Sequence, residues 1–246
     1  MSTEVTRLIQ SHRSIRKFTD ETISPEILSD VLTSGQWAPS SHNVQAYSVI
    51  VVRSDESKKQ LSILTGNQKW VEECPVFLVF CADFYKLKQA CEMNGETLAA
   101  DGVENFLVGA VDTALVAQNV LLAARSYGLG GVMIGGIRNN PREVAELLDL
   151  PPLTIPIMGM CLGYPAQEVE QKPRLPQQAY IHEERYQKEG IKAALEDYES
   201  LSAAYYERRT NGKQTDGWTK QMAHYVNKPR RVHIKEFVKE QGIQLN

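Results

Sequence analysis

The sequence predicts an α+β domain with a central, mixed but mostly antiparallel β-sheet surrounded by helices. Apolar runs of strand length alternate along the chain with segments that carry helix signals, and helical segments occupy both ends. The composition agrees, because 42% hydrophobic and 23% charged residues are typical of a globular protein. We expect the chain to form a single domain over 1–246, in which residues from about 164 to 246 are an extended C-terminal arm.

The N-terminal third is predicted to contain a short helix, a second helix, a polar loop, a strand and a third helix. The second helix begins at Ser24, since serine is a preferred N-cap and Pro25 fits the first helical turn. It ends at Ala38-Pro39, because the residue before a proline is disfavoured in the helical region. The loop, the strand and the third helix follow at residues 40–43, 47–53 and 55–64.

The middle of the chain is predicted to form the core. Pro75–Ala82 is a continuous apolar run, which indicates a strand covered on both faces. The region 83–105 is expected to be only partly helical. Leu107–Tyr127 is predicted to be the most apolar helix, ended by Gly128. Its apolar residues point in several directions, so we expect it to be covered nearly all round, in a large core, at a dimer seam, or in both.

The remaining elements are two strands, a helix and the C-terminal segment. The strands are expected at 132–134 and 155–162, on either side of a helix that begins at Asn140-Pro141 with a cap, a first-turn proline and an early glutamate. Prolines beyond Gly163 indicate an extended segment. Two further helical stretches are expected near the C-terminus, at 188–209 and 230–241, joined by a polar linker.

Charge, cysteines and histidines disfavour several classes of protein. The net charge is −3, although residues 208–246 carry nine Lys/Arg against three Asp/Glu. The four cysteines lack CxxC spacing, no histidine pair has the i,i+4 spacing of a metal site, and no GxSxG serine-hydrolase elbow occurs. The first ten residues lack a signal-peptide core, and no stretch approaches the ~20 apolar residues that span a membrane. We therefore expect a metal-free, cytoplasmic protein with reduced thiols.

Two groups of cations could bind an anion. His12-Arg13-Ser14-Ile15-Arg16 combines two guanidinium groups with a hydroxyl and an imidazole, and arginine forks suit a phosphate. Lys172-Pro173-Arg174 holds two further cations on either side of a proline. Exposed basic surface is the alternative for each group.

Glycine-rich and polar segments supply weaker signals. Gly128-Leu129-Gly130-Gly131 and Gly135-Gly136 follow a helix and flank a strand, so they do not match the strand-turn-helix order of a dinucleotide fingerprint. A helix cap with a tight turn is the simpler explanation. The polar loop that includes Ser40 and the side chain of Gln68 would ordinarily be structural.

Five motifs taken together nevertheless resemble one family. HRSIRKF, APSSHNVQ, GNQKW, DTALVAQNVLLAARSYGLGGVMIGG and KPRLP stand in this order, from about Leu8 onward. The chain resembles the oxygen-insensitive nitroreductase and flavin reductase family, in its major, NADPH-preferring branch. The resemblance implies a nitroreductase-like fold and an interlocked homodimer with exchanged C-terminal segments, which binds FMN at the subunit interface.

The same resemblance implies roles for individual residues. The FMN phosphate and ribityl chain would contact His12, Arg13, Ser14, Lys172 and Arg174. Arg16 would lie by flavin N1 and the C2 carbonyl, where negative charge gathers on reduction. Gln68 would bond the pyrimidine edge. The partner chain would contribute Ser40, His42, Asn43 and Gln45, and the flavin ring would be lined by Ile134, Gly135 and Gly136.

The implied activity is ping-pong reduction of nitroaromatics, quinones or free flavins. NADPH, or alternatively NADH, would pass a hydride to the flavin and leave before the acceptor binds, with no catalytic side chain beyond the flavin. Arg208 and Lys213 would hold the 2′-phosphate of NADPH. The alternatives are a dedicated flavin reductase that serves a monooxygenase, a non-catalytic flavin-binding protein and, much less favoured, a nucleic-acid binder through residues 228–235.

Overall fold

A computed structural model describes residues 2–245, and these form two compact units. The first unit runs to Val169 and also includes the residues from Arg231 onward. The second unit is Glu170–Arg230. The single domain expected from the sequence stays a prediction.

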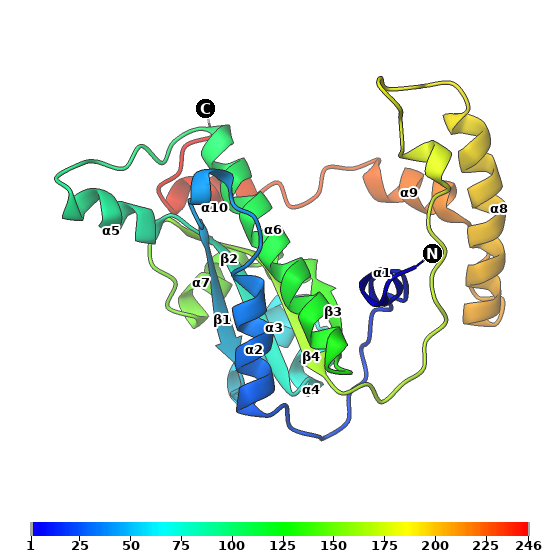
Figure 1. Cartoon of the computed structure of the whole chain (residues 1–246), viewed down its shortest axis with the longest axis horizontal. Helices are drawn as coiled ribbons and strands as arrows, with labels where there is room; N and C mark the ends of the chain where they lie inside the picture. Colours follow the sequence, from blue (N-terminus) through cyan, green and yellow to red (C-terminus); the bar gives the residue numbers. More distant parts are fainter. Residues whose placement is uncertain (1, 246) are drawn as a thin grey trace. The chain divides into compact units, whose positions relative to one another are not determined.

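The first unit is built around a four-stranded sheet (Figure 1). The strand order is β1-β2-β4-β3, and every neighbouring pair is antiparallel. The mixed character that we expected is limited to one parallel bridge, between Ser14 and Gly131. The strands are β1 (Tyr47–Val52), β2 (Val76–Asp83), β3 (Gly130–Ile134) and β4 (Thr154–Gly163).

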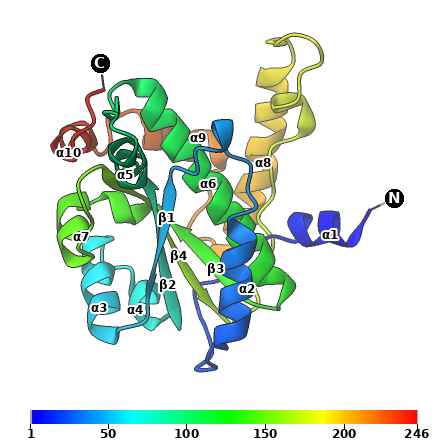
Figure 2. The same ribbon diagram turned by 60° about the vertical axis from the view of Figure 1, so that its left-hand side comes forward.

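Helices cover both faces of this sheet (Figure 2). One face is covered by α2 (Pro25–Gly35) and α6 (Val103–Ser126), and the other by α3 (Asp55–Leu64), α4 (Lys69–Glu73) and α7 (Pro141–Leu147). The central strand β2 is buried along its whole length, as its apolar run predicts. Because side chains alternate along a strand, Leu78 and Phe80 pack towards α2 and α6, whereas Phe77 and Val79 pack on the opposite face.

The remaining elements of the first unit flank this core. The C-terminal residues return to it: Phe237, Val238 and Ile243 are buried in a third apolar cluster, and the Leu153 N–H donates to Gln241 O at 2.7 Å. These additional elements are α1 (Glu4–Gln10), η1 (Ser41–Asn43), α5 (Tyr85–Met93), η2 (Gly135–Arg138) and α10 (Ile234–Glu240).

Helix α6 is buried on one side only. Val116, Val120 and Leu121 pack into the core. An apolar stripe at four-residue spacing remains exposed, with relative exposures of 47, 50, 53 and 37% for Val103, Leu107, Val111 and Leu115. The core of one chain therefore does not cover this helix nearly all round, and its coverage at a dimer seam stays a prediction. By length and composition alone α6 could also span a membrane, contrary to our expectation, although its inner contacts are those of a core helix.

Three local predictions differ from the structure. Helix α2 ends at Gly35 and not at Ala38-Pro39, and a Cβ on Gly35 would come within 2.6 Å of Val120 on α6. Gly130 and Gly131 belong to strand β3, whereas Gly128, with φ of +77°, is the helix-ending residue. The Asn140 side chain donates to Leu64 O at 2.7 Å and does not cap α7.

The second unit contains η3 (Gln177–Ala179), α8 (Ile191–Thr210) and α9 (Trp218–Val226). The sequence predicted α8 closely but missed α9. The N-terminus of α9 is capped from α8, because the Glu199 carboxylate accepts from the Gly217 N–H at 3.2 Å and the Thr219 N–H at 2.7 Å. Desolvation raises the pKa of Glu199, but the hydrogen bonds from the Thr219 hydroxyl and from the backbone N–H groups together outweigh it, so the pKa is lowered. A cap supplied from another helix has no local sequence signal.

Candidate functional site

The cationic segment near the N-terminus lies beside strand β3. The Ile15 N–H donates to Gly131 O at 3.0 Å, and Ile15 is buried against Gly130, where a Cβ would meet Ile15 Cγ1 at 2.6 Å. Only glycine allows this approach without a shift of the neighbouring segment. Ser14 and Arg16, on either side of Ile15, are half-buried. The glycine pair that we explained as a turn therefore holds the cationic segment on the sheet.

Two arginines come together at the start of this segment. Arg13 donates to Val169 O at 2.8 Å and Ser11 O at 2.9 Å, and Arg125 from the end of α6 donates to Leu8 O at 2.5 Å. Partial burial lowers the pKa of Arg125, and repulsion from Arg13 lowers it further. Neither guanidinium has an ion pair among residues 2–245, so this end of the segment favours an anion. The sequence analysis missed Arg125, since its position in the last turn of a helix did not distinguish it.

Arg16 extends towards a second group of residues. Its guanidinium carbon lies 5.6 Å from the centroid of the Trp70 ring, and Gln68 Nε2 donates to Thr65 O at 2.7 Å. A Cβ on Gly136 would come within 2.4 Å of Gln68 Nε2, so the two residues are in direct contact. Three motifs that are distant in sequence are therefore linked by these contacts, since Trp70 and Gln68 belong to one of them; the roles that the resemblance implies for Arg16, Gln68 and Gly136 stay predictions.

The chemistry of this group suits the pyrimidine edge of a flavin. Arg16 and Gln68 carry N–H groups, and the buried Trp70 Nε1 has no hydrogen-bond partner among the described residues. A buried hydrogen-bond donor without an acceptor is uncommon in a folded protein. On the open side, a Cβ on Gly135 would meet only Arg138, at 3.5 Å. Flavin carbonyl oxygens and ring nitrogens accept hydrogen bonds, so these residues fit the cofactor.

The polar loop before β1 has an unusual backbone. His42, Asn43 and Gln45 have φ of 48, 58 and 54°, and their side chains are exposed. Ser40 is half-buried, and its Oγ donates to Asp112 on α6 at 2.6 Å. The contribution of this loop to a partner subunit stays a prediction, as does the contribution of Ile134, which is buried at the end of β3.

The other cationic residues lie in the second unit. Lys172 and Arg174 border a cavity of about 440 Å³ that is also lined by tyrosines and Trp218, and Lys172 Nζ lies 5.2 Å from the Tyr206 ring centroid. Arg208 forms an ion pair with Glu170 at 2.8 Å. Lys213 is exposed in the turn after α8. The assignment of Lys172 and Arg174 to the same FMN phosphate as His12, Arg13 and Ser14 stays a prediction.

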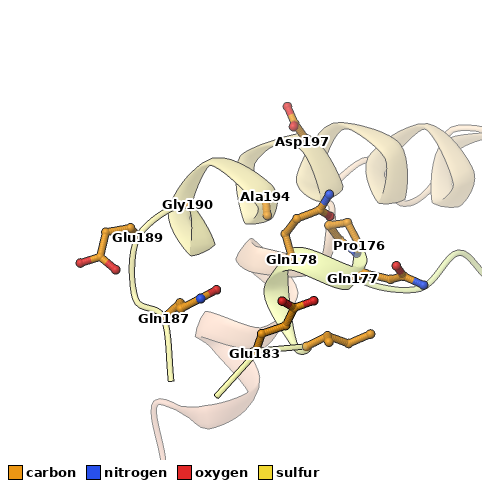
Figure 3. Close-up of a pocket in the computed structure, with 10 residues that line it drawn as sticks. Pro176, Gln177, Gln178, Glu183, Gln187, Glu189, Gly190, Ala194 and Asp197 are labelled. Atoms are coloured by element: carbon orange, nitrogen blue, oxygen red, sulfur yellow. The ribbon is translucent and has the colours of Figure 1, made fainter. Parts of the chain in front are cut away.

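A second cavity in this unit, of about 620 Å³, has a different character (Figure 3). Gln177 and Gln178 border it from η3, and Asp197 projects from α8. Together with Glu183 and Glu189, Asp197 makes the cavity acidic, so it does not suit a phosphate. Among residues 2–245, no group of three or more His, Cys, Asp or Glu side chains is arranged to hold a metal ion.

Comparison with known proteins identifies the family. The Nitroreductase family model matches residues 9–164, and the model of the Nitroreductase family, C-terminal domain, matches residues 172–246. A Cr(VI) reductase from Pseudomonas sp. (strain G-1) is 42% identical over 97% of this chain and 98% of its own length. An FMN reductase (NADPH) from Bacillus subtilis (strain 168) is 40% identical over 97% of each chain. The structure of NfrA2 from Bacillus megaterium superposes with a TM-score of 0.97 at 41% identity and covers 100% of both chains. The chain therefore belongs to the nitroreductase family, as its five motifs predict.

Proposed function

We propose that this chain is an FMN-dependent NADPH oxidoreductase that reduces nitroaromatic compounds, quinones or free flavins. The observation that carries the proposal is the linkage of three motifs through Trp70 and Gln68: Arg16 lies over the Trp70 ring, and Gln68 contacts Gly136 just after β3. Relatives that match nearly the whole chain and are named FMN reductase and Cr(VI) reductase support it.

Arg16 contributes electrostatically at the pyrimidine end of the flavin. Bound FMN supplies two-electron transfer between NADPH and an acceptor. The fixed charge of Arg16 stabilises the negative charge that reduction places at N1 and the C2 carbonyl. Its stacking against Trp70 holds the guanidinium in place. Gln68 orients the ring, because its side-chain amide is already fixed by Thr65 O.

The phosphate end is assigned to His12, Arg13 and Ser14, joined by Lys172 and Arg174. The neighbouring guanidinium of Arg125 supports this assignment, since two close cations without carboxylate partners in the described chain favour an anion. Nothing in this arrangement requires a side chain to act as an acid or base. The protein supplies orientation and charge, and one open flavin face serves donor and acceptor in turn.

We assign the coenzyme contact to Arg208 and Lys213 at the end of α8. Both are exposed and lie in the same unit, on either side of a left-handed turn at Asn211. The 2′-phosphate of NADPH would compete with Glu170 for Arg208, because an exposed ion pair is weak. NADH lacks this phosphate and would bind less well.

We also infer a homodimer with FMN at its interface. The exposed stripe of Val103, Leu107, Val111 and Leu115 on α6 supports it, because four large apolar residues on one helical face are costly to leave in water. The exposed side chains of His42, Asn43 and Gln45 are available to a flavin held by the partner. A cytoplasmic location agrees with four free cysteines, Cys74, Cys81, Cys91 and Cys161.

Steady-state kinetics tests the activity. Rates are measured over a matrix of NADPH concentrations against a nitrofuran, a quinone and free FMN. Parallel double-reciprocal lines are expected for each acceptor, since donor and acceptor use one site in turn. Intersecting lines, or no turnover with any acceptor, would contradict the proposal. Turnover of free FMN far above that of the other two would instead favour the dedicated flavin reductase, which the name of one relative also supports.

A further inference from the structure

A carboxylate in the middle of α6 is tied to the polar loop before β1. We propose that Asp112 is a positioning residue that fixes the loop Ser40–Gln45 in the conformation that binds the flavin ring. This inference rests on the proposed function, in which the loop contacts FMN. The resemblance to the family assigned no role to Asp112.

Asp112 is a buried charge without a cationic partner. Asp112 is 2% exposed. In the part of the chain that the structure describes, no Lys, Arg or His forms an ion pair with its carboxylate. A buried carboxylate without such a partner is costly unless strong hydrogen bonds satisfy it. The hydrogen bonds that Asp112 accepts therefore stabilise the buried carboxylate and, in turn, hold the segment that donates them.

Those hydrogen bonds enclose the loop. The Ser40 hydroxyl donates to Asp112 Oδ2 at 2.6 Å, and the Ala46 N–H donates to the same oxygen at 3.1 Å. Ser40 Oγ also accepts from the Gln45 N–H at 2.8 Å. The Asp112 carboxylate thus holds Ser40, the first residue of the loop, and Ala46, the residue after the loop. It also polarises the Ser40 hydroxyl, which accepts the hydrogen bond that closes the loop.

The enclosed backbone needs such an anchor. His42, Asn43 and Gln45 all have φ between 48 and 58°, a region that residues other than glycine adopt at a cost in free energy. Neighbouring bonds, from Asn43 N to Ser40 O and from Val44 N to Ser41 O, are local to the loop. They close turns but do not attach the loop to the helix.

The hydrogen bonds to Asp112 hold the loop backbone in place beneath side chains that are exposed to solvent. His42, Asn43 and Gln45 point into solvent from a strained backbone that a buried carboxylate holds. Strained backbones of this kind persist where the surroundings over-determine them, and they occur preferentially at ligand sites. Without Asp112 the loop would relax, and the flavin ring would have to reorder it on binding.

The test compares flavin binding in variants of the apoprotein. Asp112→Ala removes both acceptor bonds, and Asp112→Asn keeps one carbonyl oxygen that can restore them in part. The matched control is Asp83→Ala. Asp83 is also buried, at 6% exposure, and accepts from the Ser48 hydroxyl and the Tyr85 N–H, but it holds the start of α5. Kd values for FMN and for riboflavin are measured by quenching of flavin fluorescence.

We expect Asp112→Ala to raise both Kd values by about tenfold or more and by the same factor, because the proposed function assigns the loop to the flavin ring and not to the phosphate. Asp112→Asn should show a smaller rise, and Asp83→Ala less than a twofold change. Ser40→Ala should raise both values as well, and its effect should not add to that of Asp112→Ala, since the two residues form one unit. If Asp112→Ala does not fold, Ser40→Ala and Asp112→Asn provide the test.

Three results would overturn the inference. The first is an Asp112 variant that weakens flavin binding no more than the Asp83 control does. The second is a Ser40 variant that binds flavin like wild type. The third is a loss confined to FMN, which would place the effect at the phosphate. A wild-type protein that binds neither flavin would instead refute the proposed function itself.

Discussion

Replacing Gly136 with alanine tests the contact between η2, which follows strand β3, and the turn that contains Gln68. The new Cβ would stand 2.3 Å from Thr65 O and 2.4 Å from Gln68 Nε2, well inside van der Waals contact. Thr65 is 1% exposed, and its carbonyl oxygen accepts hydrogen bonds from Gln68 and Asn139. This oxygen cannot move away from the new Cβ without breaking those bonds. Overpacking of this kind costs about 1–3 kcal/mol. At roughly 2–4 °C per kcal/mol, the apoprotein Tm should fall by about 2–12 °C.

The same substitution should weaken FMN binding by about tenfold, because Gln68 must move. Gly135→Ala is the matched control. Its Cβ would meet only Arg138, at 3.5 Å, so the free energy of unfolding should change by less than about 0.5 kcal/mol. It should nevertheless weaken FMN binding, since the added methyl group projects to the face assigned to the ring. The assays are thermal unfolding of the apoprotein and titration with FMN.

An unchanged Tm in Gly136→Ala would refute the close packing described for Thr65 and Gln68. A large loss of stability in Gly135→Ala would mean that its open side is filled by protein. If Gly135→Ala binds FMN like wild type, the assignment of Gly135 to the flavin face is wrong.

Three further predictions concern the charged residues. Arg16→Ala should lower the flavin midpoint potential in a redox titration by about 30 mV, which is about 1.4 kcal/mol for a two-electron couple. An unchanged potential would contradict the proposal that Arg16 stabilises the reduced flavin. Glu170→Gln should lower the KM for NADPH by up to about fivefold, since it frees Arg208 from an exposed ion pair worth at most about 1 kcal/mol, and should leave the KM for NADH unchanged. Equal changes for both coenzymes would make the Arg208 pair purely structural. Arg13→Ala combined with Arg174→Ala should yield flavin-free protein, and full occupancy in its visible spectrum would contradict the phosphate assignment.

Elements with local signals could be predicted closely from the sequence. Helix α3 has the expected bounds, and α2 begins at the expected Ser24-Pro25 cap. Strand β2 is buried on both faces because its apolar run contains no polar position that could face water. Caps and runs of this kind depend on neighbouring residues, so the sequence alone determines them.

Features that depend on tertiary contacts could not be predicted. Helix α9 is capped by Glu199 from another helix, and Gly130 is required by the approach of Ile15. The site shows the same division. Motif order assigned Arg16 and Gln68 to the proposed site, whereas Arg125 and Asp112 make hydrogen bonds with segments far away in sequence. Such residues become visible only when the chain brings the segments together.

The most direct test of the account is an anaerobic visible spectrum of the purified protein before and after one equivalent of NADPH. We predict flavin bands that bleach within the mixing time and return when a nitroaromatic compound or a quinone is added. That result would establish FMN and both halves of the reaction in one sample. A colourless protein that FMN cannot reconstitute, or flavin bands that NADPH leaves unchanged, would contradict the assigned activity.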